Sequence, residues 1–287
     1  MTSGTDRPAA DDPAGADQPG GALPAAARAA AERLFGERLP HAERYATLLA
    51  TDGVVRGLIG PREAPRLWDR HLLNCAVVQE LIPARATVAD VGSGAGLPGV
   101  VLALARPDLT VTLIEAMARR AAFLDEVVTT LDLTGQVTVV RARAEESVAQ
   151  VRPAEVVTAR ALAPLDRLAQ WCLPLTTVGG HVLAIKGASA EAEIAHHAAA
   201  VRRLGGSAPT IHQCGVGLVD PPTTVVAVVR ESTSQHASRS RSRSGSGGGS
   251  GSRDGSASRR GSGSAGGPAS RGGSGARQGT GRRDRRG

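Results

Sequence analysis

The chain has 287 residues and a net charge of +7, and this charge is unevenly distributed. Residues 235–287 hold twelve Arg and two Asp, a net charge of +10, so the high isoelectric point belongs to this tail. A run of about 18 apolar residues, the minimum for a membrane span, is absent, and the N-terminus lacks the basic and apolar regions of a secretory signal. We therefore expect a cytoplasmic protein that has no membrane partner.

The three cysteines, Cys75, Cys172 and Cys214, are odd in number and far apart in the sequence. This spacing fits neither a disulfide framework nor a zinc site. We expect them to be small buried residues in a reducing compartment, and we expect no metal site.

Composition divides the chain into four segments. Residues 1–22 and 232–287 consist largely of small and polar residues, which offer little apolar surface to offset the entropy of ordering, so we expect both to be disordered. Residues 23–83 are predicted to form an N-terminal helical extension, and residues 84–231 an α/β domain.

The extension shows apolar residues at helical spacing. Residues 23–59 are predicted to form two helices with a break at Pro40, and residues 63–82 a third helix that ends before Pro83. Its Trp68, like Trp171 further on, either packs in the core or stacks on a base.

Strands and helices alternate from residue 87 onward, which predicts a doubly wound, mostly parallel sheet. Two adjacent strands at the end, without a helix between them, favour a mixed sheet with one antiparallel strand. The predicted strands cover residues 87–91, 110–114, 137–140, 156–158, 181–185, 210–219 and 223–230, with a turn at Gly179-Gly180 before the fifth. The predicted helices cover residues 97–105, 117–131, 145–151, 165–173 and 188–204.

A glycine-rich segment, Asp90-Val91-Gly92-Ser93-Gly94-Ala95-Gly96-Leu97-Pro98-Gly99, joins the first strand to the next helix. Its glycines allow positive φ angles and a close approach of the backbone to a ligand. The segment formally matches the nicotinamide dinucleotide fingerprint, so an oxidoreductase is one interpretation. Asp90 would repel a pyrophosphate and attract the ammonium or sulfonium group of S-adenosylmethionine, which favours a methyl donor. A turn without a ligand is the third interpretation.

Glu115 ends the second strand of the predicted sheet. A carboxylate at this position can accept hydrogen bonds from both ribose hydroxyls of a nucleoside ligand, in either cofactor class.

Four segments together resemble the RsmG (GidB) family: ADVGSGAGLPGVVLA, TLIEAMARRAAFL, VVTARALAPLDRLAQWC and GGHVLAIKG. The upstream WDRHLLN resembles the family's Arg-His segment, although Asn74-Cys75 stands where the family has Asp-Ser. The resemblance covers roughly residues 30–230. It implies a class I methyltransferase with a Rossmann-like mixed seven-stranded sheet. Such an enzyme uses S-adenosylmethionine to methylate N7 of a guanine in 16S (small-subunit) ribosomal RNA.

The resemblance and the strand ends together give the predicted sites. The predicted cofactor-binding residues are Asp90, Gly92, Ser93, Gly94, Gly96, Leu97, Glu115, Ala144, Glu145 and Arg160. The predicted substrate-binding residues are Arg70, His71, Arg160 and Lys186. For Arg160 and Lys186 the alternative is a salt bridge to Asp90 or Glu145.

N7 of guanine is a lone-pair acceptor without a proton, so we expect no catalytic base. The expected partner is small-subunit ribosomal RNA or the small subunit itself, and the expected oligomeric state is a monomer. The basic tail could neutralise RNA phosphates without reading sequence. Two further interpretations are a methyltransferase acting on another substrate and a non-catalytic RNA-binding module.

Overall fold

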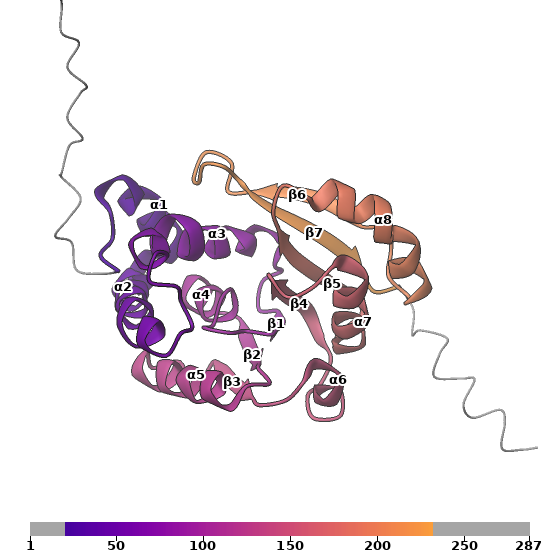
Figure 1. The fold of residues 1–287 in the computed structure, drawn as a ribbon, viewed down its shortest axis with the longest axis horizontal. Coiled ribbons are helices and arrows are strands. Elements are labelled where there is room, and N and C mark those ends of the chain that lie inside the picture. Colours follow the sequence, from indigo (N-terminus) through magenta and orange to yellow (C-terminus); the bar gives the residue numbers. More distant parts are fainter. Residues whose placement is uncertain (1–20, 232–287) are drawn as a thin grey trace, which may run out of the picture. The chain divides into compact units, whose positions relative to one another are not determined.

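The computed structural model describes residues 21–231, all of which belong to one compact unit (Figure 1). The disorder expected for residues 1–22 and 232–287 therefore concerns segments that lie almost wholly outside the described residues. Gly21 is described: its carbonyl oxygen accepts a hydrogen bond from Nε1 of Trp68 at 2.9 Å. Trp68 itself is buried and packs edge-on against Phe35, so of the two interpretations of this residue the structure shows core packing.

Seven strands form one sheet in the order β3-β2-β1-β4-β5-β7-β6. Strands β1 to β5 are parallel, and β7 lies antiparallel between β5 and β6. This confirms the predicted mixed sheet, including the antiparallel pair at its end. The strands are β1 (Thr87–Val91), β2 (Thr110–Ile114), β3 (Val137–Val140), β4 (Ala154–Arg160), β5 (Thr176–Lys186), β6 (Thr210–Cys214) and β7 (Thr223–Val229).

Gly179-Gly180 does not form the predicted turn but lies inside β5, and that prediction was wrong. The pairing of β4 with β5 shifts register at this point. A Cβ atom at Gly180 would lie 2.6 Å from the carbonyl oxygen of Glu155 on the neighbouring strand. Gly180 therefore permits a close approach of two backbones, whereas Gly179 takes a φ angle of +83°, which favours glycine.

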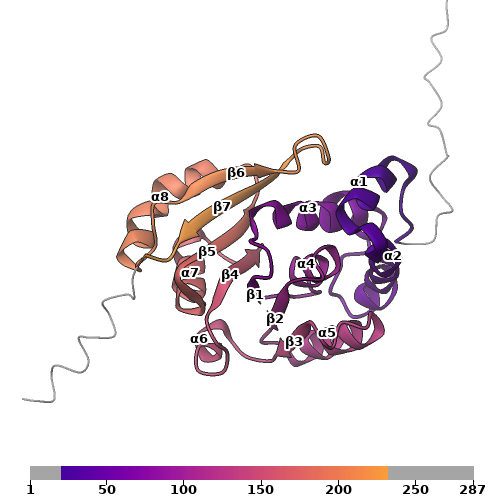
Figure 2. The ribbon, with the colours of Figure 1, turned by 180° about the vertical axis from the view of Figure 1, so that it is seen from behind.

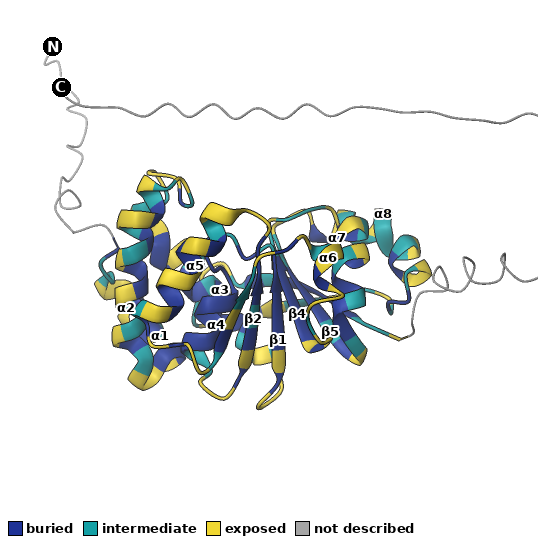
Figure 3. Ribbon diagram, turned by 90° about the horizontal axis from the view of Figure 1, so that it is seen from below, coloured by how far each residue is buried: buried dark blue, intermediate teal, exposed yellow. Residues whose placement is uncertain are grey.

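Helices cover both faces of the sheet, as the two opposite views and the view from below show (Figures 1, 2 and 3). One face carries α1 (Ala25–Phe35), α2 (Leu39–Leu48), α3 (Leu73–Ala76), α4 (Gly99–Ala105) and α5 (Ala118–Thr130). The other carries α6 (Ala144–Ser147), α7 (Leu165–Cys172) and α8 (Ala190–Arg203).

Each face of the sheet has its own hydrophobic core, because successive strand residues point to opposite faces. Val111 and Leu113 of β2 pack with the N-terminal helices, whereas Ala89 and Val91 of β1 pack with α7 and α8. Residues 23–83, which were predicted to form an extension, thus share one hydrophobic core with one face of the sheet. The three cysteines are free and buried, as expected.

The N-terminal helical region is less regular than its apolar spacing predicted. Between α1 and α2 a 3₁₀ turn (Gly36–Arg38) makes the break, and Pro40 lies in the first turn of α2 rather than at the break. Residues 63–82 do not form one α-helix. They form a 3₁₀ turn (Ala64–Arg66), a π-helical turn (Trp68–Leu72), α3 and a second 3₁₀ turn (Val77–Leu81). A π-helical turn commonly occurs near a functional site, and this one contains the Arg-His pair.

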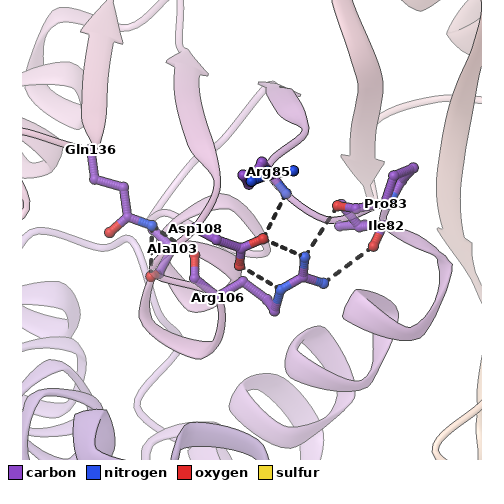
Figure 4. Close-up of polar contacts among 7 residues, drawn as sticks. All are labelled: Ile82, Pro83, Arg85, Ala103, Arg106, Asp108 and Gln136. Atoms are coloured by element: carbon purple, nitrogen blue, oxygen red, sulfur yellow. Dashed lines mark hydrogen bonds and ion pairs between the residues drawn. The ribbon is translucent and has the colours of Figure 1, made fainter.

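A polar cluster fastens the segment that enters β1 to the turn between α4 and β2 (Figure 4). The guanidinium of Arg106 pairs with both carboxylate oxygens of Asp108, each at 2.7 Å, and donates to the carbonyl oxygens of Ile82 and Pro83. The Asp108 carboxylate also accepts from the backbone N–H of Arg85 at 2.7 Å. This cluster lies at the edge where β1 and β2 begin, opposite the edge where they end.

Candidate functional site

The glycine loop, residues 92–98, connects the end of β1 to α4 and takes a conformation that only glycine adopts without strain. Gly92, Gly94 and Gly96 have φ angles of +69°, +59° and +101°. A Cβ atom would lie 2.6 Å from the Leu162 side chain at Gly92, and 2.6 Å from Val100 at Gly96. The loop is therefore a tightly packed cradle of backbone at the point where the strand order reverses between β1 and β4, which is where ligands bind in open α/β sheets.

Asp90 lies beneath this loop and not at its surface. Its carboxylate accepts hydrogen bonds from the backbone N–H of Gly99 at 3.1 Å and from the hydroxyl of Thr158 at 2.9 Å, and the residue is 1% exposed. Burial raises the pKa of Asp90 to about 6. The side chain thus holds the start of α4 against β4. It does not face a ligand's ammonium group, so the charge argument drawn from the sequence does not hold.

Ser93 is turned inward in the same way. Its hydroxyl donates to the carbonyl oxygen of Asp90 at 2.9 Å, and the residue is almost fully buried. A ligand above the loop would meet the backbone of Ser93 and not its hydroxyl.

Glu115 stands at the end of β2 and faces the loop from the other side. Its carboxylate accepts from the backbone N–H of Gly94 at 3.0 Å and from that of Met117 at 2.9 Å. A carboxylate has about four acceptor positions, so two are still open. This geometry leaves Glu115 able to accept from the hydroxyls of a ribose.

Two cavities flank the glycine loop, and together they contain most of the predicted cofactor residues. The Glu115 cavity, about 240 Å³, is lined by Val91, Gly92, Ile114, Glu115, Ala116, Met117, Arg120, Ala142, Arg143, Ala144, Glu145, Leu162 and Trp171. The glycine-loop cavity, about 300 Å³, is lined by Leu58, Ile59, Gly60, Glu63, His71, Gly92, Ser93, Gly94, Ala95, Leu97, Arg120, Arg160, Ala161 and Leu162. Together the two cavities reach the volume of pockets that hold small ligands and cofactors, roughly 300–1,000 Å³.

The Glu115 cavity has the features that a nucleoside needs. Apolar side chains form most of its walls, Glu115 offers hydroxyl acceptors, and the half-buried Trp171 provides an indole on one side. Trp171 is thus not wholly packed in the core, and its stacking on a base stays a prediction.

Arg160 ends β4 and is held by residues of the N-terminal region. Its guanidinium donates to Nδ1 of His71 and to the sulfur of Cys75, the latter at 3.1 Å. Since arginine can only donate, Nδ1 of a neutral His71 is the acceptor, and Nε2 carries the ring proton. Nε2 lies 3.0 Å from Glu63, which therefore accepts this proton's hydrogen bond.

Glu63 also receives Arg70, whose guanidinium lies 3.1 Å from its carboxylate. Burial, reinforced by the charge of Arg160, holds the pKa of His71 below its ordinary value. The salt bridge of Arg160 to Asp90 or Glu145, the alternative considered from the sequence, is absent from the contacts of the described residues. In its place Arg160, His71, Glu63 and Arg70 form a connected cluster. The first three of these residues line the glycine-loop cavity.

Lys186 ends β5 beside Arg160, as predicted, but it is paired with a different acid than the two considered from the sequence. Its ammonium group lies 2.7 Å from the carboxylate of Glu193 on α8 and donates to the carbonyl oxygen of Ala163 at 2.8 Å. Two further clefts, of about 720 and 340 Å³, share Arg160, Ile185, Lys186 and Gly187 in their walls. The structure thus brings two cations together beside the glycine-loop cavity.

Two residues in this region, Tyr45 and Arg120, were not predicted as site residues from the sequence. Tyr45 is fully buried, and its hydroxyl donates to the carbonyl oxygen of Ala95 in the glycine loop at 2.7 Å. Its only signal in the sequence is that it is the single tyrosine of the chain. Arg120 contributes to the walls of both flanking cavities. Its signal in the sequence is its place at the start of the predicted helix that follows Glu115.

Within residues 21–231 no group of His, Cys, Asp or Glu could hold a metal ion. In the same part of the chain, no helix combines the length and the apolarity needed for a membrane span.

Comparison with known proteins places this geometry in a family. The family model described as GidB, rRNA small subunit methyltransferase G, matches residues 38–219. The ribosomal RNA small subunit methyltransferase G of Salinispora arenicola (strain CNS-205) is 67% identical over 195 residues, which are 66% of this chain and 81% of the relative. The enzyme of the same name from Renibacterium salmoninarum is 58% identical over 191 residues, covering 67% of this chain and 88% of its own. The chain belongs to the family of ribosomal RNA small subunit methyltransferase G.

Proposed function

We propose that this protein transfers the methyl group of S-adenosylmethionine to N7 of a guanine in small-subunit ribosomal RNA. The observation that carries the proposal is the pair of cavities around the glycine loop, directly beside Arg160 and Lys186. A cofactor site and a cationic surface for RNA thus adjoin at the same edge of the sheet. Membership of a family of ribosomal RNA methyltransferases supports the choice of reaction.

The residues around the loop fit the cofactor. Glu115 would accept from the ribose hydroxyls, and Ala144 and Glu145 would border the adenine. Gly92, Ser93, Gly94 and Leu97 would border the methionine, whereas Gly96 lines neither cavity and would shape the loop from behind. The cradle supports this assignment, because a Cβ at Gly92 or Gly96 would collide with packed side chains. When bound, S-adenosylmethionine supplies a methyl group on a sulfonium, which a lone pair can attack.

The chemistry demanded of the chain is alignment rather than proton transfer. N7 of guanine offers a lone pair and loses no proton on methylation. Holding the base and the cofactor in line is the proximity contribution, and the chain's own part is to bind and orient both. His71 fits this view, because its Nδ1 already accepts from Arg160 and its Nε2 donates to Glu63, which leaves no free nitrogen to act as a base.

The RNA side of the site would be made by Arg70, His71, Arg160 and Lys186. Guanidinium and ammonium groups bind phosphate oxygens and position a nucleic acid without reading its sequence. The cleft bounded by Arg70, Arg160 and Lys186 gives these cations a common recess for the target nucleotide.

We also propose that the protein acts as a cytoplasmic monomer, and that residues 23–83 and 84–231 are its two structural parts.

The charge of Asp90 does not distinguish a methyl donor from a dinucleotide, because the carboxylate is buried beneath the glycine loop. The choice between an oxidoreductase and a methyltransferase therefore depends on the family, which is one of methyltransferases.

Methyl transfer from labelled S-adenosylmethionine to isolated small-subunit RNA, with large-subunit RNA as the comparison, tests the proposal. We expect label in small-subunit RNA only. The Gly92→Val variant should lose cofactor binding and transfer, because its side chain would meet Leu162. Gly135→Ala is the matched control, since nothing lies within 4 Å of its added Cβ. Transfer to neither RNA, or full activity of Gly92→Val, would contradict the proposed site.

A further inference from the structure

Arg120 occupies the junction of the two cavities that flank the glycine loop. It lies in the first turn of α5, which follows Glu115 and the end of β2. The two cavities have only three residues in common, Gly92, Arg120 and Leu162. A ligand that extends from the Glu115 cavity into the glycine-loop cavity must therefore pass the Arg120 side chain.

The guanidinium of Arg120 has no hydrogen-bond or ion-pair partner among residues 21–231, and its Nε is buried. This sets it apart from the other two arginines in the cluster beside it. Arg160 is held by His71 and Cys75, and Arg70 is paired with Glu63. A buried donor without an acceptor is unfavourable, which indicates that an acceptor arrives from outside the chain.

We infer that Arg120 binds the carboxylate of the cofactor's methionine moiety, an inference that rests on the proposed use of S-adenosylmethionine. The carboxylate is the cofactor's one anionic group, whereas its ammonium and sulfonium groups would be repelled by Arg120. Arg120 forms no ion pair with Glu63, Glu115 or Glu145, the acids that line these cavities, among the described residues. Glu63 is held by Arg70 and His71, and Glu115 accepts from two backbone N–H groups. The planar guanidinium can meet a carboxylate with two parallel hydrogen bonds.

An RNA phosphate is the other anion that could reach an arginine in this region. Arg120 lines the cavity that also contains Glu115 and Glu145, whereas none of the residues proposed for RNA lines it. Its neighbour Arg119 is exposed and lines neither cavity, so it provides a cation of the same type one residue away. The position favours the cofactor's carboxylate.

Decarboxylated S-adenosylmethionine tests the inference directly, because it keeps the adenosine, the sulfonium and the amino group but lacks the carboxylate. Calorimetric titration would compare both ligands on the wild type, Arg120→Gln and Arg119→Gln. We expect Arg120→Gln to lower the affinity for S-adenosylmethionine by about ten- to a hundredfold, the usual range for a hydrogen bond between charged groups. The affinity of Arg120→Gln for the decarboxylated ligand should stay within about twofold of the wild-type affinity, because that ligand lacks the carboxylate that Arg120 would contact. Arg119→Gln should change neither affinity.

Thermal unfolding of each variant keeps the result interpretable. Arg120 makes no side-chain contact with an acceptor in the described residues, so Arg120→Gln should unfold at the wild-type temperature. Should Arg120→Gln fold poorly, Arg120→Lys serves in its place. Lysine retains the positive charge but lacks the planar guanidinium that donates two parallel hydrogen bonds. Arg120→Lys should therefore lose part of the preference for S-adenosylmethionine over the decarboxylated ligand.

The outcomes separate the inference from the proposed function. An equal loss of affinity for both ligands in Arg120→Gln would mean that Arg120 contacts the ribose or supports the fold, and it would overturn the inference. Unchanged affinity for both, with weaker binding of small-subunit RNA, would assign Arg120 to a phosphate and overturn it as well. A wild-type protein that binds neither ligand would refute the proposed function itself, whereas a failure confined to Arg120→Gln would not.

Discussion

The hydroxyl of Tyr45 donates a hydrogen bond to the carbonyl oxygen of Ala95, and this 2.7 Å contact joins helix α2 to the middle of the glycine loop. Tyr45 is fully buried and packs closely against the loop, because a Cβ at Gly96 would lie 2.8 Å from the same hydroxyl. The N-terminal helices therefore support the proposed cofactor site as well as covering one face of the sheet.

Replacing Tyr45 by Phe should reduce both stability and cofactor affinity. The change removes the hydroxyl and leaves the Ala95 carbonyl without its partner, which costs about 1–3 kcal/mol. Because the loop is then held less firmly, we expect S-adenosylmethionine to bind several-fold more weakly by calorimetry. Thr47→Val on the same helix is the control, since the Thr47 hydroxyl bonds only within the helix. Cofactor affinity equal to the wild type would show that Tyr45 packs against the loop without supporting it.

The buried carboxyl of Asp90 should give the protein a characteristic pH dependence of stability. Burial raises the pKa of Asp90 from 3.8 to about 6, so the folded protein binds this proton more tightly than the unfolded chain. The resulting stabilisation is fully present below pH 4 and is lost as the pH rises through about 6. A shift of this size corresponds to about 3 kcal/mol at most.

Denaturant unfolding at a series of pH values checks this effect. Compared with wild type, Asp90→Asn should become steadily more stable between about pH 4 and 7, because the amide carries no charge to bury. Asp125→Asn on the exposed face of α5 serves as the control and should follow the wild-type profile. Parallel profiles for wild type and Asp90→Asn would contradict the raised pKa.

Lys186 is proposed to contact RNA and also forms an ion pair with Glu193, and variants of the two residues separate these roles. If the ammonium group contacts RNA, Lys186→Ala should weaken RNA binding, and Glu193→Gln, which frees Lys186 and removes a negative charge, should not. A purely structural pair would lose similar stability in both variants, without an effect on RNA binding. Filter binding with small-subunit RNA and thermal unfolding measure the two quantities. Cofactor affinity should be unchanged in either variant.

The rate of methyl transfer should depend little on pH between about 6 and 8, the range in which a histidine base would titrate. N7 gives up no proton, and both nitrogens of His71 are already engaged in hydrogen bonds. Single-turnover measurements at saturating RNA and cofactor would reveal the trend. A tenfold rise for each pH unit would point to a catalytic base and to a different target atom.

The sheet could be predicted from the sequence because its signals are local. Runs such as TVTLI are rich in β-branched residues and lie between turns and helical segments, so β2 and β3 were predicted with their observed bounds. The order of elements, together with two final strands that lack a helix between them, is enough to predict a mixed sheet.

The contacts within the site could not be predicted in the same way. Arg160 and His71 are 89 residues apart, and their contact depends on a π-helical turn that apolar spacing does not distinguish from an α-helix. Likewise, a position at a strand end shows that Asp90 lies near the loop but not on which side. The structure shows its carboxylate turned under the loop toward Gly99 and Thr158.

The methylated nucleoside itself tests the central claim most directly. Small-subunit RNA from cells with and without the gene would be digested and mapped by mass spectrometry, with the purified protein restoring the modification in vitro. The account predicts one 7-methylguanosine that is present with the gene, absent without it, and restored by the protein and S-adenosylmethionine but not by the Gly92→Val variant. A methyl group on another atom of the RNA, or identical small-subunit RNA from both cells, would contradict it.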